Sequence, residues 1–354
     1  MTLTDGRGRG PPLRERAFHA WLARTLPAGR GGELPLGDDA AALRPPAGAV
    51  AVVSTDTLVE GTHFVADSPP YSIGRAATAV SLSDVAAKGA APAAVFLALV
   101  VPVGTPRTWA ERVVRGAEAE AVAFGAHVLG GDTKPGPTRT VVSTVVGWGR
   151  AGHLAPRSGA RPGDVLVTTG AVGRGGAAYA RWRNGGTPRP RALRGLLDVR
   201  PRVRAGIALA RFAHAMLDTS DGLAESCRLM ATASGVRVEV DEAGLPLVAE
   251  LRSPARSAPR RREAVFFGGD YELLAAVPAR DVAAATRAVA RVGVPLTAVG
   301  RVVRGRGAVL RTDRGTIPMP RAGWDPFLSG REPRPRGVPR NTVAQFRRAH
   351  VTLK

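Results

Sequence analysis

The sequence contains a single cysteine, Cys227, among 354 residues. One cysteine cannot form a disulfide within the chain, which excludes a disulfide-stapled fold and favours a reducing compartment. The longest apolar stretch, residues 91–103, contains prolines and is too short to cross a bilayer. The N-terminus is polar and glycine-rich and lacks the apolar segment of a signal peptide. We therefore expect a cytoplasmic protein without a membrane segment.

Acidic residues are also scarce: 29 Asp and Glu stand against 50 Lys and Arg, for a formal net charge of +21. Such an excess can mark a nucleic-acid-binding protein. Here nearly all the basic residues are arginines, scattered through a chain rich in alanine, glycine and proline. This composition is typical of a GC-rich coding bias, and no aromatic-plus-basic module is present. We do not expect nucleic acid as a partner, although the basic C-terminal tail keeps that alternative open.

The hydrophobic pattern predicts two α/β domains of ordinary size. We divide the chain into a disordered N-terminus (residues 1–16), an N-terminal domain (17–150), a C-terminal domain (151–327) and a basic Arg/Pro-rich tail (328–354). Apolar spacing predicts helices at residues 17–26, 73–88, 109–124, 203–212, 222–234 and 282–291. Strands are predicted at residues 49–55, 93–101, 140–146, 165–169, 236–240, 272–277, 296–303 and 308–311, and those at 49–55 and 93–101 are expected to be buried.

The placement of the few acids is the most informative feature. Aspartates recur beside small residues in five short segments, mostly interpreted as loops, at residues 37–40, 54–57, 83–84, 130–133 and 218–222. Carboxylates that converge on one site repel each other unless cations join them, and magnesium prefers such oxygen ligands together with phosphate oxygens. Neighbouring glycines let the backbone approach a phosphate closely. The residues alone therefore predict a nucleotide-phosphate site with several magnesium ions.

Each acidic segment also has an ordinary structural interpretation. Asp84 lies on a predicted helix and could be a solvated acid, Asp221 could cap a helix N-terminus, and residues 130–133 could be a turn after a strand. Five such segments in an acid-poor chain favour the site over five unrelated turns. The sequence contains no Walker P-loop and no zinc-like Cys/His spacing, so neither of those common sites is expected.

In their order along the chain, these segments resemble the motifs of the thiamine-monophosphate kinases, a family of the aminoimidazole-ribonucleotide-synthetase-like superfamily. The matching segments are GDDAA at 37–41, STDTLVEGTHF at 54–64, SLSDVAAKGA at 81–90, GGDT at 130–133, RSGA at 157–160, DTSDGL at 218–223, DYEL at 270–273 and GWDPF at 323–327. The resemblance covers residues 15–327. It implies a two-domain α/β fold whose N-terminal domain pairs with a second copy to form a β-barrel, with the nucleotide near that homodimer interface.

The resemblance also implies roles for individual residues. Magnesium ions are expected at Asp39, Ser54, Thr55, Asp56, Asp84, Asp132, Asp218 and Asp221. ATP is expected near Gly131, Asp132, Arg157 and Ser220. Thiamine monophosphate is expected near His63, Gly269 and Trp324. The implied reaction transfers the γ-phosphoryl group of ATP to the phosphate of thiamine monophosphate, by positioning and charge neutralisation rather than by a general base.

One departure from the family pattern concerns the substrate. Gly269 stands where the family usually has a glutamate, so His63, Trp324 and either Asp270 or Glu272 would have to contribute more to acceptor binding. Two alternatives therefore stay open: a sister ATP-using enzyme of the same superfamily with another acceptor, and a non-catalytic nucleotide-binding paralogue. The retained acids argue against the paralogue, because an inactive site has no need of clustered carboxylates.

Overall fold

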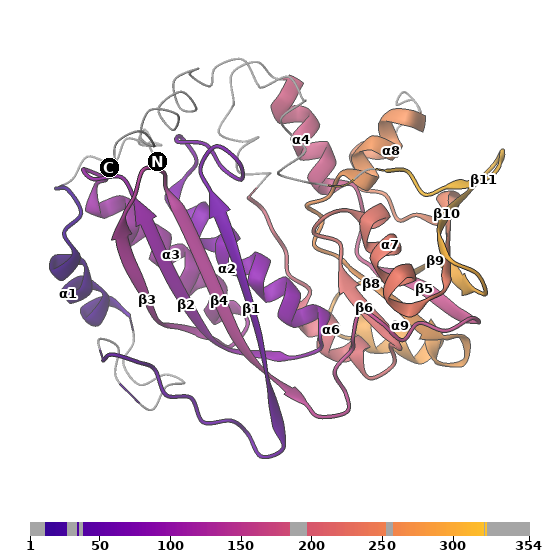
Figure 1. Cartoon of the computed structure of the whole chain (residues 1–354), viewed down its shortest axis with the longest axis horizontal. Helices are drawn as coiled ribbons and strands as arrows, with labels where there is room; N and C mark the ends of the chain where they lie inside the picture. The colour runs from indigo at the N-terminus through magenta and orange to yellow at the C-terminus, as the bar shows by residue number, and fades with distance from the viewer. Residues whose placement is uncertain are drawn as a thin grey trace, which may run out of the picture.

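The structure, a computed structural model, describes residues 11–26, 34, 38–184, 197–252, 258–321 and 323. Its strands form two sheets, one from each half of the chain, and Figure 1 shows the two halves side by side. The first sheet has the order β1-β4-β2-β3, and the second has the order β11-β10-β7-β9-β5-β8-β6. This is the mixed α/β architecture with two domains that the sequence predicts.

The N-terminal half consists of a four-stranded sheet with helices on one face. Its elements are α1 (Glu15–Thr25), β1 (Ala49–Val59), α2 (Pro70–Ala87), β2 (Ala91–Val101), α3 (Arg107–Ala123), β3 (His127–Pro135) and β4 (Thr140–Arg150). Strand β4 pairs antiparallel with β1 and β2, and β2 pairs parallel with β3. Strands β1 and β3 are therefore the two edges of this sheet.

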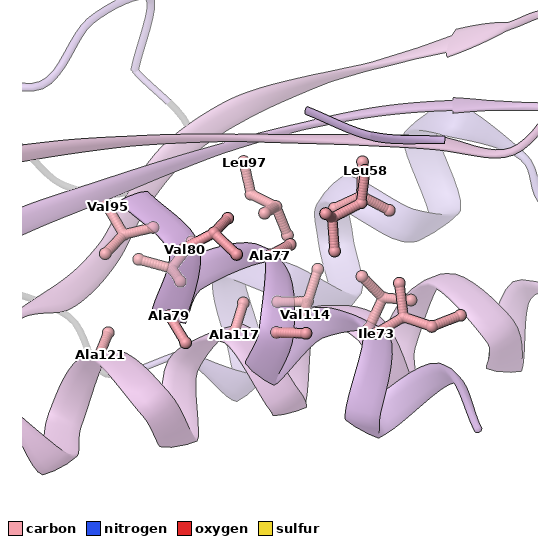
Figure 2. Packing of buried hydrophobic residues seen from close by; sticks show 14 of the residues in the cluster. Leu58, Ile73, Ala77, Ala79, Val80, Val95, Leu97, Val114, Ala117 and Ala121 are labelled. Carbon is pink, nitrogen blue, oxygen red and sulfur yellow. The ribbon is translucent and has the colours of Figure 1, made fainter. Parts of the chain in front are cut away.

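A hydrophobic core lies between this sheet and helices α2 and α3 (Figure 2). Alternate residues of the strands, such as Leu58 and Leu97, face Ile73 and Val80 of α2, as expected for a strand with one buried face. Each fully buried residue of this size contributes about 1.5–3 kcal/mol. The two helices approach closely because they meet at glycine: a Cβ on Gly74 would lie 1.8 Å from a carbonyl oxygen of α3.

The opposite face of the N-terminal sheet carries no helix in Figure 1. Val53 on β1 is 59% exposed, and most other residues of this strand are exposed or half-buried. The prediction of a buried strand at residues 49–55 is therefore wrong about burial, because β1 is an edge strand with one open face. Within one chain this sheet is open, so a closed β-barrel would need a second copy.

The C-terminal half is a seven-stranded mixed sheet with helices around it. Its strands are β5 (Asp164–Thr169), β6 (Ala215–Asp218), β7 (Arg237–Asp241), β8 (Leu273–Pro278), β9 (Leu296–Val303), β10 (Gly307–Thr312) and β11 (Gly315–Pro318). Its helices are α4 (Arg174–Asn184), α6 (Val203–Ala210), α7 (Leu223–Ser234), α8 (Ala258–Phe267) and α9 (Val282–Ala290), with short 3₁₀ turns at Glu242–Gly244, Ala249–Leu251 and Ala279–Asp281. Two clusters of buried residues, one containing Phe266 and Met230 and the other Leu209 and Leu273, form its core.

Several sequence predictions need correction at the chain ends and boundaries. Residues 11–16 are not disordered, because the Leu13 N–H donates to the Thr105 carbonyl at 2.8 Å and α1 begins at Glu15. Residues 1–10 and the tail at 328–354 lie outside the described residues. The sequence pattern does not predict α4, β6, α8 or β11. Among the described residues, no helix is long and apolar enough to span a membrane.

Candidate functional site

A cavity of about 430 Å³ is lined by residues of both halves of the chain. The N-terminal half contributes the end of β1, the loop that follows it and one side of α2, and the C-terminal half contributes the segment after β6 and the start of α4. Eight of the predicted site residues line it together, and six of them were predicted to bind metal or acceptor: Asp56, His63, Asp84, Asp218, Asp221 and Gly269. Arg157 and Ser220, predicted near ATP, line the same cavity.

Four carboxylates gather at this cavity from separate elements. Asp56 lies within β1, Asp84 on α2, and Asp218 and Asp221 at the end of β6 and in the turn after it. Burial, and then the negative charges of Asp84 and Asp218, raise the pKa of Asp56 to about 6. Burial and then the charge of Asp84 likewise raise the pKa of Asp218 to about 6. The cluster is therefore anionic, crowded and short of compensating positive charge.

Serine hydroxyls hold these carboxylates in place. Ser54 Oγ donates to Asp84 Oδ2 at 2.5 Å, and Ser83 Oγ donates to Asp218 Oδ2 at 2.6 Å. Ser220 Oγ donates to Asp218 Oδ1 at 2.8 Å. Asp56 differs, because its Oδ2 atom is buried without a hydrogen-bond partner in the described residues. Burying a carboxylate oxygen without a hydrogen-bond partner costs free energy. Coordination of a cation by Asp56 Oδ2 would offset that cost.

Thr55 does not join this cluster within one chain. Successive residues of a strand face opposite sides of the sheet, so Ser54 and Asp56 face α2 while Thr55 faces the open side. The Thr55 hydroxyl lies 2.9 Å from the Thr144 hydroxyl of β4 on that open face. The prediction that residues 54–57 form a loop is also wrong, since all four lie inside β1.

His63 lines the cavity as a neutral imidazole. Its Nδ1 atom accepts a hydrogen bond from the Val59 N–H at 3.0 Å, which leaves Nε2 to carry the proton. Burial lowers the pKa of His63, which further favours the neutral form. At the C-terminal end of α2, Lys88 Nζ donates to the carbonyls of Ala155 and Met216 at 3.2 and 3.0 Å. These bonds tie α2 to the segments that carry Arg157 and Asp218.

Asp270 and Glu272 do not line the cavity, contrary to the expectation that one of them would bind the acceptor. The Asp270 carboxylate accepts the backbone N–H groups of Gly173 and Gly175 at 2.6 and 2.9 Å, at the start of α4. Glu272 accepts from Arg202 Nε at 2.6 Å and from a buried threonine hydroxyl at 2.7 Å. Both carboxylates therefore form their hydrogen bonds within the C-terminal domain.

A second cavity, of about 730 Å³, is lined by three further predicted site residues. Helix α1, residues 38–41 and strands β2 and β3 line it, and Asp39, Gly131 and Asp132 lie at its surface. Asp132 is exposed, and Lys134 Nζ donates to its Oδ1 at 2.7 Å. That bond, followed by one from the Thr133 N–H, lowers the pKa of Asp132. Residues 130–133 lie within β3, so their interpretation as a turn is wrong.

Within one chain, the predicted site residues are therefore divided between two cavities. Asp56 on β1 and Asp132 on β3 lie at opposite edges of the same sheet, three strand spacings or about 14 Å apart. Within the part of the chain that the structure describes, no three His, Cys, Asp or Glu side chains lie close enough to form a ready metal site. Trp324 lies outside the described residues.

The sequence analysis missed Tyr271, which lines the first cavity next to Gly269. The signal in the sequence is its place in the DYEL segment at 270–273. That segment alone does not say which of its residues faces the cavity, because residues 270–272 lie outside the strands and Tyr271 has a φ of +54°.

Two matches define the class of protein to which this fold and site belong. The AIR synthase related protein N-terminal domain matches residues 37–149, and the corresponding C-terminal domain matches residues 161–313. Thiamine-monophosphate kinase of Halobacterium salinarum is 41% identical over 268 residues, which cover 75% of this chain and 87% of the relative. That of Caulobacter vibrioides is 34% identical over 319 residues, which cover 88% and 91%. The chain therefore belongs to the thiamine-monophosphate kinase family, as its motifs predict.

Solved structures agree with this assignment. Thiamine-monophosphate kinase from Stenotrophomonas maltophilia K279a is 34% identical, with a TM-score of 0.73 over 83% of this chain and 93% of that one. AaThiL complexed with AMPPCP and TMP is 25% identical, with a TM-score of 0.66 over 88% and 98%. Hydrogenase maturation protein HypE, at 21% identity and a TM-score of 0.67, shares the fold alone.

Proposed function

We propose that the protein phosphorylates thiamine monophosphate with ATP to give thiamine diphosphate and ADP. The observation that carries this proposal is the acid-lined cavity between the two domains, which combines four carboxylates with a neutral histidine and an arginine. The family relationship supports the same reaction. Neither the sister-enzyme alternative nor the inactive paralogue has a comparable observation in its favour.

We assign the acceptor and the reacting phosphates to the first cavity. Arg157 and Ser220 line it, the Arg157 guanidinium supplies hydrogen-bond donors to phosphate oxygens, and His63 presents Nε2–H toward the acceptor. The acceptor phosphate has a second pKa of about 6 and is mostly ionised near neutral pH. No general base is then required, and the residues act by holding donor and acceptor in line.

We assign the nucleoside part of ATP to the second cavity. Its walls are apolar along α1 and α3, including Phe18, Leu22 and Val114, while Asp39 and Asp132 lie at its polar end. An apolar cavity with a few polar groups at one side suits a planar base attached to a charged chain. The polar end is the natural position for the phosphates and their cations.

The two cavities would meet in a homodimer. The open face of the N-terminal sheet carries Val53, Thr55 and their neighbours. In one chain, each of the edge strands β1 and β3 pairs with another strand on one side only. An exposed apolar face with open edges is unfavourable in water, so pairing with a second copy is expected. We propose that two N-terminal sheets form the β-barrel and that the β3 edge of one chain completes the acid cluster of the other.

Magnesium fits the residues of the first cavity. The buried Asp56 Oδ2 without a partner and the mutually repelling carboxylates of Asp84 and Asp218 form an oxygen donor set of the kind that magnesium prefers. We assign these acids, Asp221 and Ser54 to one part of the magnesium site, and Thr55, Asp39 and Asp132 to the part completed across the dimer. Bound magnesium would neutralise the charge of the transferring phosphoryl group.

An acceptor comparison tests the proposal. Initial rates of ADP formation are measured at saturating ATP and magnesium with thiamine monophosphate, with unphosphorylated thiamine and with an aminoimidazole precursor. We expect turnover with thiamine monophosphate only. Turnover with the aminoimidazole precursor instead would establish the sister-enzyme alternative. We further propose a cytoplasmic location, supported by the single, buried, free Cys227, and no nucleic-acid partner.

A further inference from the structure

Tyr271 has an unusual backbone conformation for its residue type. Its φ angle is +54°, and among the described residues it is the sole non-glycine residue with a positive φ. The left-handed region is unfavourable for a bulky side chain, and such a residue persists only where its surroundings fix it. Strain of this kind concentrates at binding and catalytic sites, where it holds a side chain in a required position.

The residues on either side of Tyr271 fix this conformation. Asp270 is held by two backbone N–H groups at the start of α4, and Glu272 by Arg202. The Glu272 backbone is also bound, because its N–H donates to Thr219 Oγ1 at 3.1 Å and its carbonyl accepts from the Thr219 N–H at 2.8 Å. With both neighbours turned into the C-terminal domain, the Tyr271 side chain is directed across the domain boundary.

Tyr271 lines the same cavity as the acid cluster. Its ring packs against the core of the N-terminal domain, and it lines the first cavity. A tyrosine phenol is an O–H donor near neutral pH, because its ordinary pKa is about 10. In the part of the chain that the structure describes, its hydroxyl has no hydrogen-bond partner, although the neighbouring carboxylates are bonded to serines.

We propose that the Tyr271 hydroxyl donates a hydrogen bond to the phosphate of the acceptor substrate, which makes Tyr271 a recognition residue for a phosphate monoester. This inference rests on the proposed function and deepens it. A neutral donor suits this position because it adds no charge to a site already crowded with carboxylates. It also offers the phosphate a partner at the place where the acids would otherwise only repel it. No proton is transferred.

The test compares binding of two ligands to two variants. Thiamine monophosphate and unphosphorylated thiamine are titrated calorimetrically, in buffer with magnesium and without ATP, into the full-length protein and into Tyr271→Phe. The ring, and hence its packing, is kept. We expect thiamine monophosphate to bind Tyr271→Phe about 10- to 100-fold more weakly, the effect of a hydrogen bond to a charged group. Thiamine should bind both proteins equally, because it lacks the phosphate.

Tyr71→Phe is the matched control, since Tyr71 is 44% exposed on α2 and lies outside the cavity. It should bind both ligands as the unmodified protein does. Equal weakening of both ligands by Tyr271→Phe would assign Tyr271 a packing role and overturn the inference, as would unchanged binding of thiamine monophosphate. If the unmodified protein binds thiamine and thiamine monophosphate with equal affinity, the inference fails but the assignment of the acceptor pocket is kept. Binding of neither ligand would remove the proposed function, and the inference with it.

Discussion

Replacing Asp56 by asparagine should make the metal-free protein more stable while abolishing its turnover. In the folded protein the pKa of Asp56 rises from 3.8 to about 6, because the carboxylate is buried beside Asp84 and Asp218 and one of its oxygens has no partner. This rise corresponds to about 3 kcal/mol of destabilisation of the ionised form. Asparagine has the same shape and no charge, so about 3 kcal/mol is the upper limit of the expected gain.

The sign of the pH dependence follows from the raised pKa. Between about pH 4 and pH 6 the folded protein keeps a proton on Asp56 that the unfolded chain has lost, so the stabilising contribution of the protonated acid disappears as the pH rises through this window. The metal-free protein should therefore lose stability from pH 5 to pH 8, and Asp56→Asn should lose less. The two proteins should differ more at pH 8 than at pH 5.

The assay is thermal unfolding at pH 5 and pH 8, first with EDTA and then with magnesium. At pH 8 with EDTA the Tm of Asp56→Asn should exceed that of the unmodified protein by several degrees. Magnesium should raise the Tm of the unmodified protein more than that of the variant, because binding to the folded state stabilises it. A lower Tm for Asp56→Asn at pH 8 with EDTA would show that the ionised carboxylate is stabilising, and would refute this reasoning.

Three further substitutions test other parts of the account. Asp132→Asn should lower kcat about 100-fold or more with an unchanged Tm. Asp313→Asn, on a distant turn, should retain full activity. Equal rates for the two variants would show that Asp132 does not belong to the active site. Gly269→Glu should lower the Tm and should not improve the KM for thiamine monophosphate. Gly269 has a φ of +76°, and an L-residue in the left-handed region costs about 1–2 kcal/mol. An improved KM with an unchanged Tm would contradict this. Val53→Arg should convert the dimer into a monomer in sedimentation. Val103→Arg should leave the dimer intact, because Val103 is 92% exposed and lies outside the open sheet face. A dimer from both variants, or a monomeric unmodified protein, would rule out the proposed interface.

The sequence predicts the elements whose pattern is strong. The apolar spacing of residues 73–88 predicts α2, and the predicted helix at 17–26 is confirmed as α1. Helix α4 was missed because its second and third residues are glycines, which are poor helix formers. Its glycines are needed for packing: a Cβ on Gly176 would lie 2.2 Å from the Ala264 carbonyl of α8. Tertiary contact, rather than local propensity, decides that this segment is helical.

Strand β3 shows the same limit at the site. The Gly130-Gly131 pair favours a turn locally, yet it continues a strand because Gly131 lies against the backbone of β2, where a Cβ would approach the Leu97 carbonyl to 1.9 Å. The aspartates of the family motifs were found from the sequence. Their division between two cavities was not, because it depends on the strand order that places β1 and β3 at opposite edges of the sheet.

Product analysis of a single incubation tests the central claim most directly. The full-length protein is incubated with ATP, magnesium and thiamine monophosphate, and thiamine diphosphate and ADP are separated and quantified together. The account predicts that the two products form in equal amounts and that both are absent when thiamine monophosphate is left out. ADP formed without thiamine diphosphate, or neither product in the presence of tightly bound ATP, would contradict the assignment of thiamine monophosphate as the phosphoryl acceptor.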